Sequence, residues 1–307
     1  MSATTPISLG ETGLFDPTAP LTPSGNLRRR ALVDRFVQVV ATAAALAAVA
    51  VLVIVVYGVV VRGAAALNLG FVFTNPQGLA SGGIANALLG TLEIVAAAAL
   101  IALPLGILTG LYLTEFAGPR SRTARTLKLG LDMMQGLPTI VVGLFVYGLI
   151  VIPAHKESGF AGAVALSIVM LPLIARASQE VLLLVPGTLR EAADALGVNR
   201  WRAVLTVILP VATGGIVTGA ILAIARAAGE TAPLLICDSL FNPTSTSFNL
   251  FHGVPSIPML IYTSYDLPLA DAVTRAWGAA LVLMIFILIA NIGARVLLAR
   301  SRGKMGG

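Results

Sequence analysis

The sequence is poor in the residues that soluble domains and cysteine-based sites need. Of its 307 residues, 11% are charged and 57% are apolar, whereas a soluble domain usually carries about 25% charged residues. The one cysteine, Cys237, excludes an internal disulfide and a metal site built from cysteines. Too little polar surface remains to cover a soluble fold of this length. We therefore expect an integral membrane protein.

A phosphate-binding loop of the form GxxxxGK[ST] is also missing. Gly303-Lys304 lacks both the upstream glycine and a following Ser or Thr. If the chain uses ATP, another polypeptide must hydrolyse it, and we expect no cofactor on this chain. The net charge of +6 needs no nucleic acid partner, because basic loops facing anionic lipid account for it.

Long apolar runs are what the sequence has instead. A helix needs about 20 apolar residues to cross a bilayer. Pro104 predicts a kink in the second of these runs, and the fourth is short and contains Pro172. The predicted fold class is all-α, a polytopic membrane bundle of six transmembrane helices. The runs are Phe36–Val61, Ala85–Leu113, Met133–Ile152, Phe160–Ala175, Ala203–Ala228 and Ala276–Ala294.

The basic residues predict the orientation, since Lys and Arg accumulate on cytoplasmic loops. Most of the 20 lie before the first run, between the second and third, between the fourth and fifth, and after the sixth. Both termini are therefore expected to be cytoplasmic. We predict a mobile tail at 1–35, a first transmembrane helix at 36–62, a core of five helices at 82–298 with a cytoplasmic loop at 186–203, and a basic tail at 299–307.

The stretch from Val185 to Pro210 carries the clearest local pattern. Thr188 with Glu191 three residues later predicts a capping box, and Gly197 suits the left-handed position that ends a helix. Asn199 can cap a second helix. Leu189, Ala192, Ala193 and Leu196 form a small apolar stripe between these signals. The stripe can pack on the protein's own helix ends, or it can dock into a groove of a cytoplasmic partner.

The same stretch resembles the EAA motif of permeases in ATP-binding-cassette (ABC) importers. The resemblance rests on Glu191-Ala192-Ala193, Gly197, Val207 and Leu209-Pro210, with Val207 in place of the commoner Ile. It implies that Glu191, Ala192, Ala193, Gly197, Leu209 and Pro210 couple the permease to a separate ATPase subunit. It also implies the type I importer permease fold.

Charged residues inside spans are functional candidates, because burying them in lipid is costly. Arg226 and Glu230 are four residues apart, near the outer end of the fifth run, and Glu93 lies in the second. Arg226 can form a structural ion pair with Glu230 or Glu93, or it can contact an anion on a translocation path. For Glu93 the structural ion pair is the favoured interpretation. Asp132 and Gln135 are expected at the cytoplasmic interface, in water.

Arg226–Leu235 (RAAGETAPLL) is similar to the A-type permease subunit of the phosphate-specific transport system. Gly136–Phe145, Gly106–Glu115 and Ser256–Tyr262 agree with that family, although Thr139 stands where it usually has Ser. The resemblance implies a phosphate importer of a bacterial cytoplasmic membrane in which Arg226 and Glu230 pass phosphate. It implies a C-type second permease, two ATPase subunits that bind ATP and Mg, and an extracytoplasmic phosphate-binding protein.

Two alternatives remain open on the sequence alone. A permease of the same fold for sulfate, molybdate or tungstate would share the loop and differ only in its substrate contacts. A membrane-embedded enzyme would need a cluster of titratable groups at one depth, and a channel would not need the ordered loop. The stretch from Thr231 to Thr274 is expected to pack at the outer mouth and to contact a solute receptor.

Overall fold

The computed structural model describes residues 27–78, 81–118, 120–238 and 249–305, and it divides into two compact units, Met1–Val56 and Tyr57–Gly307. The described part of the first unit belongs to one helix, α1 (Leu27–Ala64). This helix is apolar around its whole circumference, which suits lipid surroundings. It begins before the predicted Phe36, because arginines are good helix formers. Residues 27–35 are thus helical rather than part of a tail, and 1–26 lie outside the described residues.

Among the described residues, five helices are long and apolar enough to cross a membrane. After α1 comes α3 (Ala85–Leu111), extended by a π-helical turn, η1 (Tyr112–Phe116). The next are α7 (Gly159–Leu183) and the continuous helix of α9 (Arg200–Ala203), η3 (Val204–Ile208) and α10 (Leu209–Ala227). The last is α13 (Ala270–Met305), so residues 299–305 of the predicted basic tail are helical. The all-α membrane bundle is confirmed.

The predicted third span, Met133–Ile152, is not one straight helix. One helix, α4 (Arg122–Gly136), ends inside this run. The chain then continues at an angle of 104° to α4 through α5 (Thr139–Val146), η2 (Tyr147–Val151) and α6 (Ile152–Ala154). Pro138 causes the break, because a proline forces the preceding residue out of the helical region, and Leu137 has an extended ψ of 134°. Within the part of the chain that the structure describes, a sixth span exists only if this bent pair counts as one.

The predicted fourth span, Phe160–Ala175, is too short. The helix α7 runs from Gly159 to Leu183 and keeps Pro172 inside it, which a membrane helix tolerates when its neighbours satisfy the freed backbone groups. The residues directly after Ala175 are mostly polar, so the apolar run in the sequence ends there although the helix α7 continues. One of them, Arg176, forms an ion pair with Asp132 of α4.

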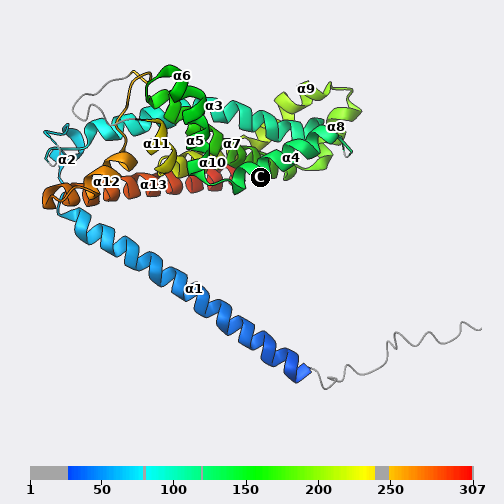
Figure 1. The fold of residues 1–307 in the computed structure, drawn as a ribbon. Helices are drawn as coiled ribbons and strands as arrows, with labels where there is room; N and C mark the ends of the chain where they lie inside the picture. Colours follow the sequence, from blue (N-terminus) through cyan, green and yellow to red (C-terminus); the bar gives the residue numbers. More distant parts are fainter. Residues whose placement is uncertain (1–26, 79–80, 119, 239–248, 306–307) are drawn as a thin grey trace, which may run out of the picture. The chain divides into compact units, whose positions relative to one another are not determined.

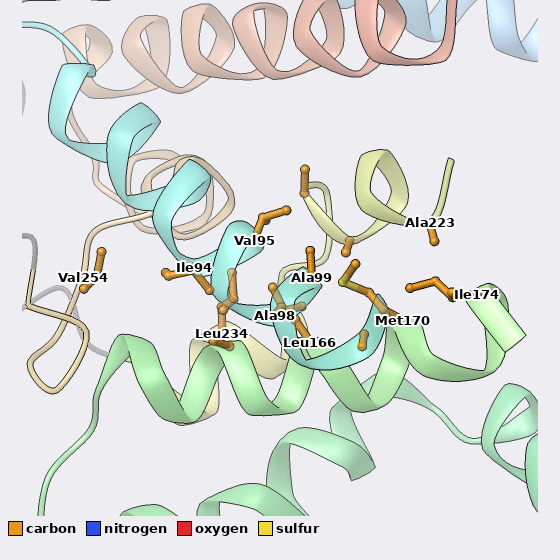
Figure 2. Close-up of a cluster of buried hydrophobic side chains, with 14 of the residues drawn as sticks. Ile94, Val95, Ala98, Ala99, Leu166, Met170, Ile174, Ala223, Leu234 and Val254 are labelled. Atoms are coloured by element: carbon orange, nitrogen blue, oxygen red, sulfur yellow. The ribbon is translucent and has the colours of Figure 1, made fainter. Parts of the chain in front are cut away.

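The core lies where α3 packs lengthwise against α7 (Figure 1). Glycines allow the close approach: a Cβ on Gly106 would come within 2.8 Å of Ile174, and one on Gly110 within 2.8 Å of Ser178. Small residues take this role in membrane helices because contact between them replaces the hydrophobic effect. Figure 2 shows side chains of the two helices, such as Ile94, Leu166 and Met170, meeting in one buried cluster.

Short helices lie toward the two ends of the bundle (Figure 1). α11 (Ala232–Cys237) packs against α5 and α7, and α12 (Ile257–Tyr265) packs against α13. At this end lies also α2 (Leu69–Phe73), while α8 (Gly187–Ala195) lies at the other. The described part of the stretch Thr231–Thr274 therefore packs on the bundle, and its position at the outer mouth stays a prediction. Its contact with a solute receptor stays a prediction, and residues 239–248 lie outside the described part.

Candidate functional site

The loop at 186–203 consists of α8, a tight turn and α9. Gly197 has a φ of +67°, and the amides of Gly197 and Val198 donate to the carbonyl groups of Asp194 and Ala193 at 3.0 Å. The side chain of Asn199 accepts a hydrogen bond from the Trp201 amide at 3.1 Å. The glycine turn and the Asn199 cap are therefore confirmed.

The prediction of a capping box formed by Thr188 and Glu191 is wrong. α8 begins at Gly187 after Pro186, and no side chain caps it. Pro186 has a φ of −56° and a ψ of 135°, so the chain enters the helix directly after the proline, which needs no N–H partner of its own. Thr188 then lies inside the first turn, past the capping position.

The apolar stripe of α8 is divided between two surroundings. Ala193 is buried, and Leu189 packs against a cluster that contains Leu182, Val185 and Val204. Glu191, Ala192 and Leu196 are exposed, and Leu196 is 82% exposed. Packing on the protein's own helices thus accounts for one side of α8 only, and an exposed side that carries Glu191, Ala192 and Leu196 remains for a partner.

The last residues of the motif, Leu209 and Pro210, begin α10 directly after the π-helical turn η3. Leu209 packs on the same cluster as Leu189, whereas Pro210 is exposed. A π-helical turn before a proline lengthens the spacing where the proline lacks its N–H donor. The two ends of the motif are therefore held on one core, and the loop is a fixed part of the bundle.

A buried carboxylate, which the sequence did not single out, holds this loop. Glu115 in η1 has a side chain that is 0% exposed. The guanidinium of Arg190 in α8 donates to it through Nη2 at 2.7 Å and Nε at 3.2 Å, and Nη2 of Arg200 lies 3.7 Å away. A lone Glu at the end of an apolar run was the available signal, but its closest partner, Arg190, lies 75 positions further along the chain.

The second candidate site is a cavity of about 270 Å³ between α4, α5, α7 and the end of α10. Its polar lining groups are Gln135, Thr139 and Arg226, and α7 contributes Val169, Pro172 and Leu173 to the lining. These α7 residues lie halfway along that helix. Arg226 is thus near the far end of α10, as expected, and shares a cavity with the middle of α7.

Arg226 and Glu230 are brought together, but loosely. Nε of Arg226 lies 4.0 Å from Oε1 of Glu230, and their side chains are 67% and 17% exposed. α10 ends at Ala227, so the pair spans a turn rather than one helical face. Glu93 is half-buried in α3, and among the described residues no ion pair involves it. The structural ion pair predicted for Glu93 does not form within this part of the chain.

Gln135 and Asp132 each have a partner that the sequence did not indicate. Gln135 lines the cavity and donates to the carbonyl oxygen of Pro172 at 3.4 Å, while Asp132 pairs with Arg176 one helical turn away. Both side chains are nevertheless exposed, as predicted, and their position at the cytoplasmic interface stays a prediction. A guanidinium, a primary amide and a hydroxyl facing one cavity are donors suited to an oxyanion.

Comparison with known proteins first defines the class of protein. The family model of the binding-protein-dependent transport system inner membrane component matches residues 102–303. A MetNI methionine ABC transporter, solved in an inward-facing conformation, matches with a TM-score of 0.56 at 19% identity, over 71% of this chain and 97% of that one. The type I ABC importer permease fold is thereby confirmed.

Curated relatives narrow the class to a family. The phosphate transport system permease protein PstA 1 of Mycobacterium tuberculosis (strain CDC 1551 / Oshkosh) is 42% identical over 219 residues, 71% of either chain. PstA of Haemophilus influenzae is 37% identical over 243 residues, 79% of this chain and 85% of that protein. The chain belongs to the PstA family of inner membrane permease components.

Proposed function

We propose that this chain is one permease subunit of an importer that moves inorganic phosphate across a bacterial cytoplasmic membrane, with both termini in the cytoplasm. The observation that carries the proposal is the exposed guanidinium of Arg226 in a cavity halfway along α7. The relatives at 37% and 42% identity are phosphate transport system permeases by name. Their names and this donor set favour the same solute.

The chemistry of the cavity supports transport rather than catalysis. A guanidinium offers a rigid fork of N–H donors that matches tetrahedral oxyanions, and it stays charged at any working pH. Glu230 lies near enough to offset that charge but too far to hydrogen-bond to it. A pathway must attract its ion and also release it, and a loosely held arginine meets both needs.

The remaining subunits follow from the loop at 186–203. An exposed apolar residue, Leu196, stands beside Glu191 and Ala192 on the outward side of α8. This side suits a helix-in-groove contact with an ATPase that binds ATP and Mg. A second, C-type permease would complete the pathway, and an extracytoplasmic phosphate-binding protein would deliver the solute. This chain itself would bind no cofactor.

The test is uptake of labelled phosphate by proteoliposomes that contain the whole complex. Arg226→Ala should lower uptake about ten- to a hundredfold, because a hydrogen bond to a charged group contributes about 1.5–3 kcal/mol. Arg226→Lys should lie between, since it keeps the charge and loses the fork. Arg122→Ala is the matched control, because Arg122 is exposed on α4 away from the cavity.

Three outcomes would contradict the proposal. Normal uptake by Arg226→Ala would remove the residue from the pathway. Stronger competition by sulfate, molybdate or tungstate than by unlabelled phosphate would assign the chain to another oxyanion. Uptake that continues without ATP would indicate a channel.

A further inference from the structure

Glu115 is a charged group withdrawn from water at the end of a membrane helix. Its side chain is 0% exposed, and burying a carboxylate is costly unless hydrogen bonds and opposite charge compensate for it. Apolar residues of the same size would close this part of the core at lower cost. The position of Glu115 therefore calls for an explanation beyond packing.

The partner Arg190 joins three elements through one guanidinium. Its Nε and Nη2 donate to Glu115 at the end of α3, as described above. Its Nη1 donates to the carbonyl oxygen of Val185 at 2.7 Å, and Nη2 also donates to that of Leu182 at 2.8 Å. Leu182 lies in the last turn of α7, and Val185 follows that helix. Arg190 therefore fixes α8 to the ends of the two core helices, α3 and α7.

Arg200 approaches the same carboxylate from the other side of the turn. It opens α9, and its Nη2 lies 3.7 Å from Oε2 of Glu115. Arg190 and Arg200 thus flank the turn at Gly197, and both point to one buried carboxylate. Phe116, next to Glu115, adds a ring contact with Trp201 at 4.6 Å between centroids. Both arms of the loop at 186–203 are attached to the end of α3.

We propose that Glu115, Arg190 and Arg200 form a transmission joint, through which movement of the loop at 186–203 is passed to α3 and α7. The proposal rests on the function proposed above, in which a motor subunit pulls on the loop. An apolar contact alone would let α8 slide over the helix ends, whereas the directional hydrogen bonds from Arg190 to Glu115, together with the positive charge of Arg200 at 3.7 Å, force the elements to move together. α7 carries one wall of the Arg226 cavity, so the joint connects the docking side of α8 to the pathway.

The complex in proteoliposomes tests the joint by the ratio of phosphate imported to ATP hydrolysed. Glu115→Gln keeps the shape and removes the charge, and it should lower this ratio at least about fivefold while hydrolysis continues. Glu180→Gln is the matched control, since Glu180 is exposed on α7 and the described residues place it in no ion pair. A merely structural role predicts instead that uptake and hydrolysis fall together, or that neither changes; either result overturns the joint.

A second variant covers the case in which Glu115→Gln does not fold. Arg190→Lys keeps the carboxylate paired but replaces three nitrogens by one, so it cannot hold Glu115 and both carbonyl groups with the same geometry. The same drop in the ratio is expected. An unchanged ratio in Arg190→Lys overturns the joint.

A readout without any solute separates this inference from the function on which it rests. Nitroxide labels on Leu196→Cys and Leu129→Cys, both exposed, report the distance between α8 and α4 in the full chain. The distribution of this distance should broaden in Arg190→Lys and stay narrow in Glu180→Gln. Equal widths in the two variants would overturn the joint even if the unaltered complex transports phosphate. If the distribution broadens in Arg190→Lys but the unaltered complex imports no phosphate, the joint stands and the proposed function is refuted.

Discussion

Gly197 shows how one backbone angle decides which residues a position accepts. Its φ is +67°, and a Cβ added there would meet nothing within 4 Å. A larger side chain at this position would therefore meet no steric clash, and only the left-handed backbone conformation disfavours it. For most residues this conformation costs about 1–2 kcal/mol, whereas Asn visits it readily.

Replacing Gly197 by Val should therefore lower the free energy of unfolding of the loop by about 1–2 kcal/mol and weaken co-purification with the ATPase. Gly197→Asn should restore most of the loss. Gly130→Val is the control, because Gly130 on α4 also has open space around its Cβ position but no positive φ. Thermal unfolding and pull-down yield measure both effects, and equal losses in the Asn and Val variants would refute the argument from φ.

At the scale of elements, the sequence predicted where helices lie better than where they begin, end or bend. Apolar runs revealed the spans, yet Met133–Ile152 was one run although Pro138 breaks it into two helices. The sequence predicted that α7 ends at Ala175, because most of the residues directly after it are polar. In the structure these polar residues find partners on another helix, such as Asp132 for Arg176. For the same reason Glu115 was missed: a run of residues shows a charge but not its partner across the fold.

The contact of α3 with α7 depends on glycine at the points of closest approach. Gly110→Leu should lower stability by about 1–3 kcal/mol, because overpacking displaces the neighbouring backbone; a Cβ there would lie 3.1 Å from the carbonyl oxygen of Ala175. Gly148→Leu on η2, where nothing lies within 4 Å, is the control. The midpoint of thermal unfolding in detergent measures the difference, and equal shifts would show that the close approach is not limiting.

For the whole molecule, the untested prediction is the orientation in the membrane. The loop at 186–203 and the segment around His252 lie at opposite ends of α7, since the His252 carbonyl oxygen accepts from Gly159 and Arg190 donates to Leu182. Basic residues gather beside the first of these, which predicts that it faces the cytoplasm.

Thiol labelling of intact spheroplasts checks this orientation. His252→Cys should react with a membrane-impermeant maleimide, and Leu196→Cys should react only after permeabilisation. The native thiol does not interfere, because burial, with the nearby carboxylates of Asp238 and Glu157, raises the pKa of Cys237 to about 11. It stays protonated at neutral pH, and the unaltered chain should take up no label. The reverse labelling pattern would invert the topology and remove the importer assignment with it.

The separation of 4.0 Å between Arg226 and Glu230 has a consequence for turnover. A tight pair would behave as a tethered inhibitor, since each arriving anion would have to evict the carboxylate from the fork. At this distance the carboxylate leaves the N–H donors uncovered while still repelling any anion that occupies them. Under the proposed function, phosphate would then enter without displacing the carboxylate, and the repulsion would assist its departure.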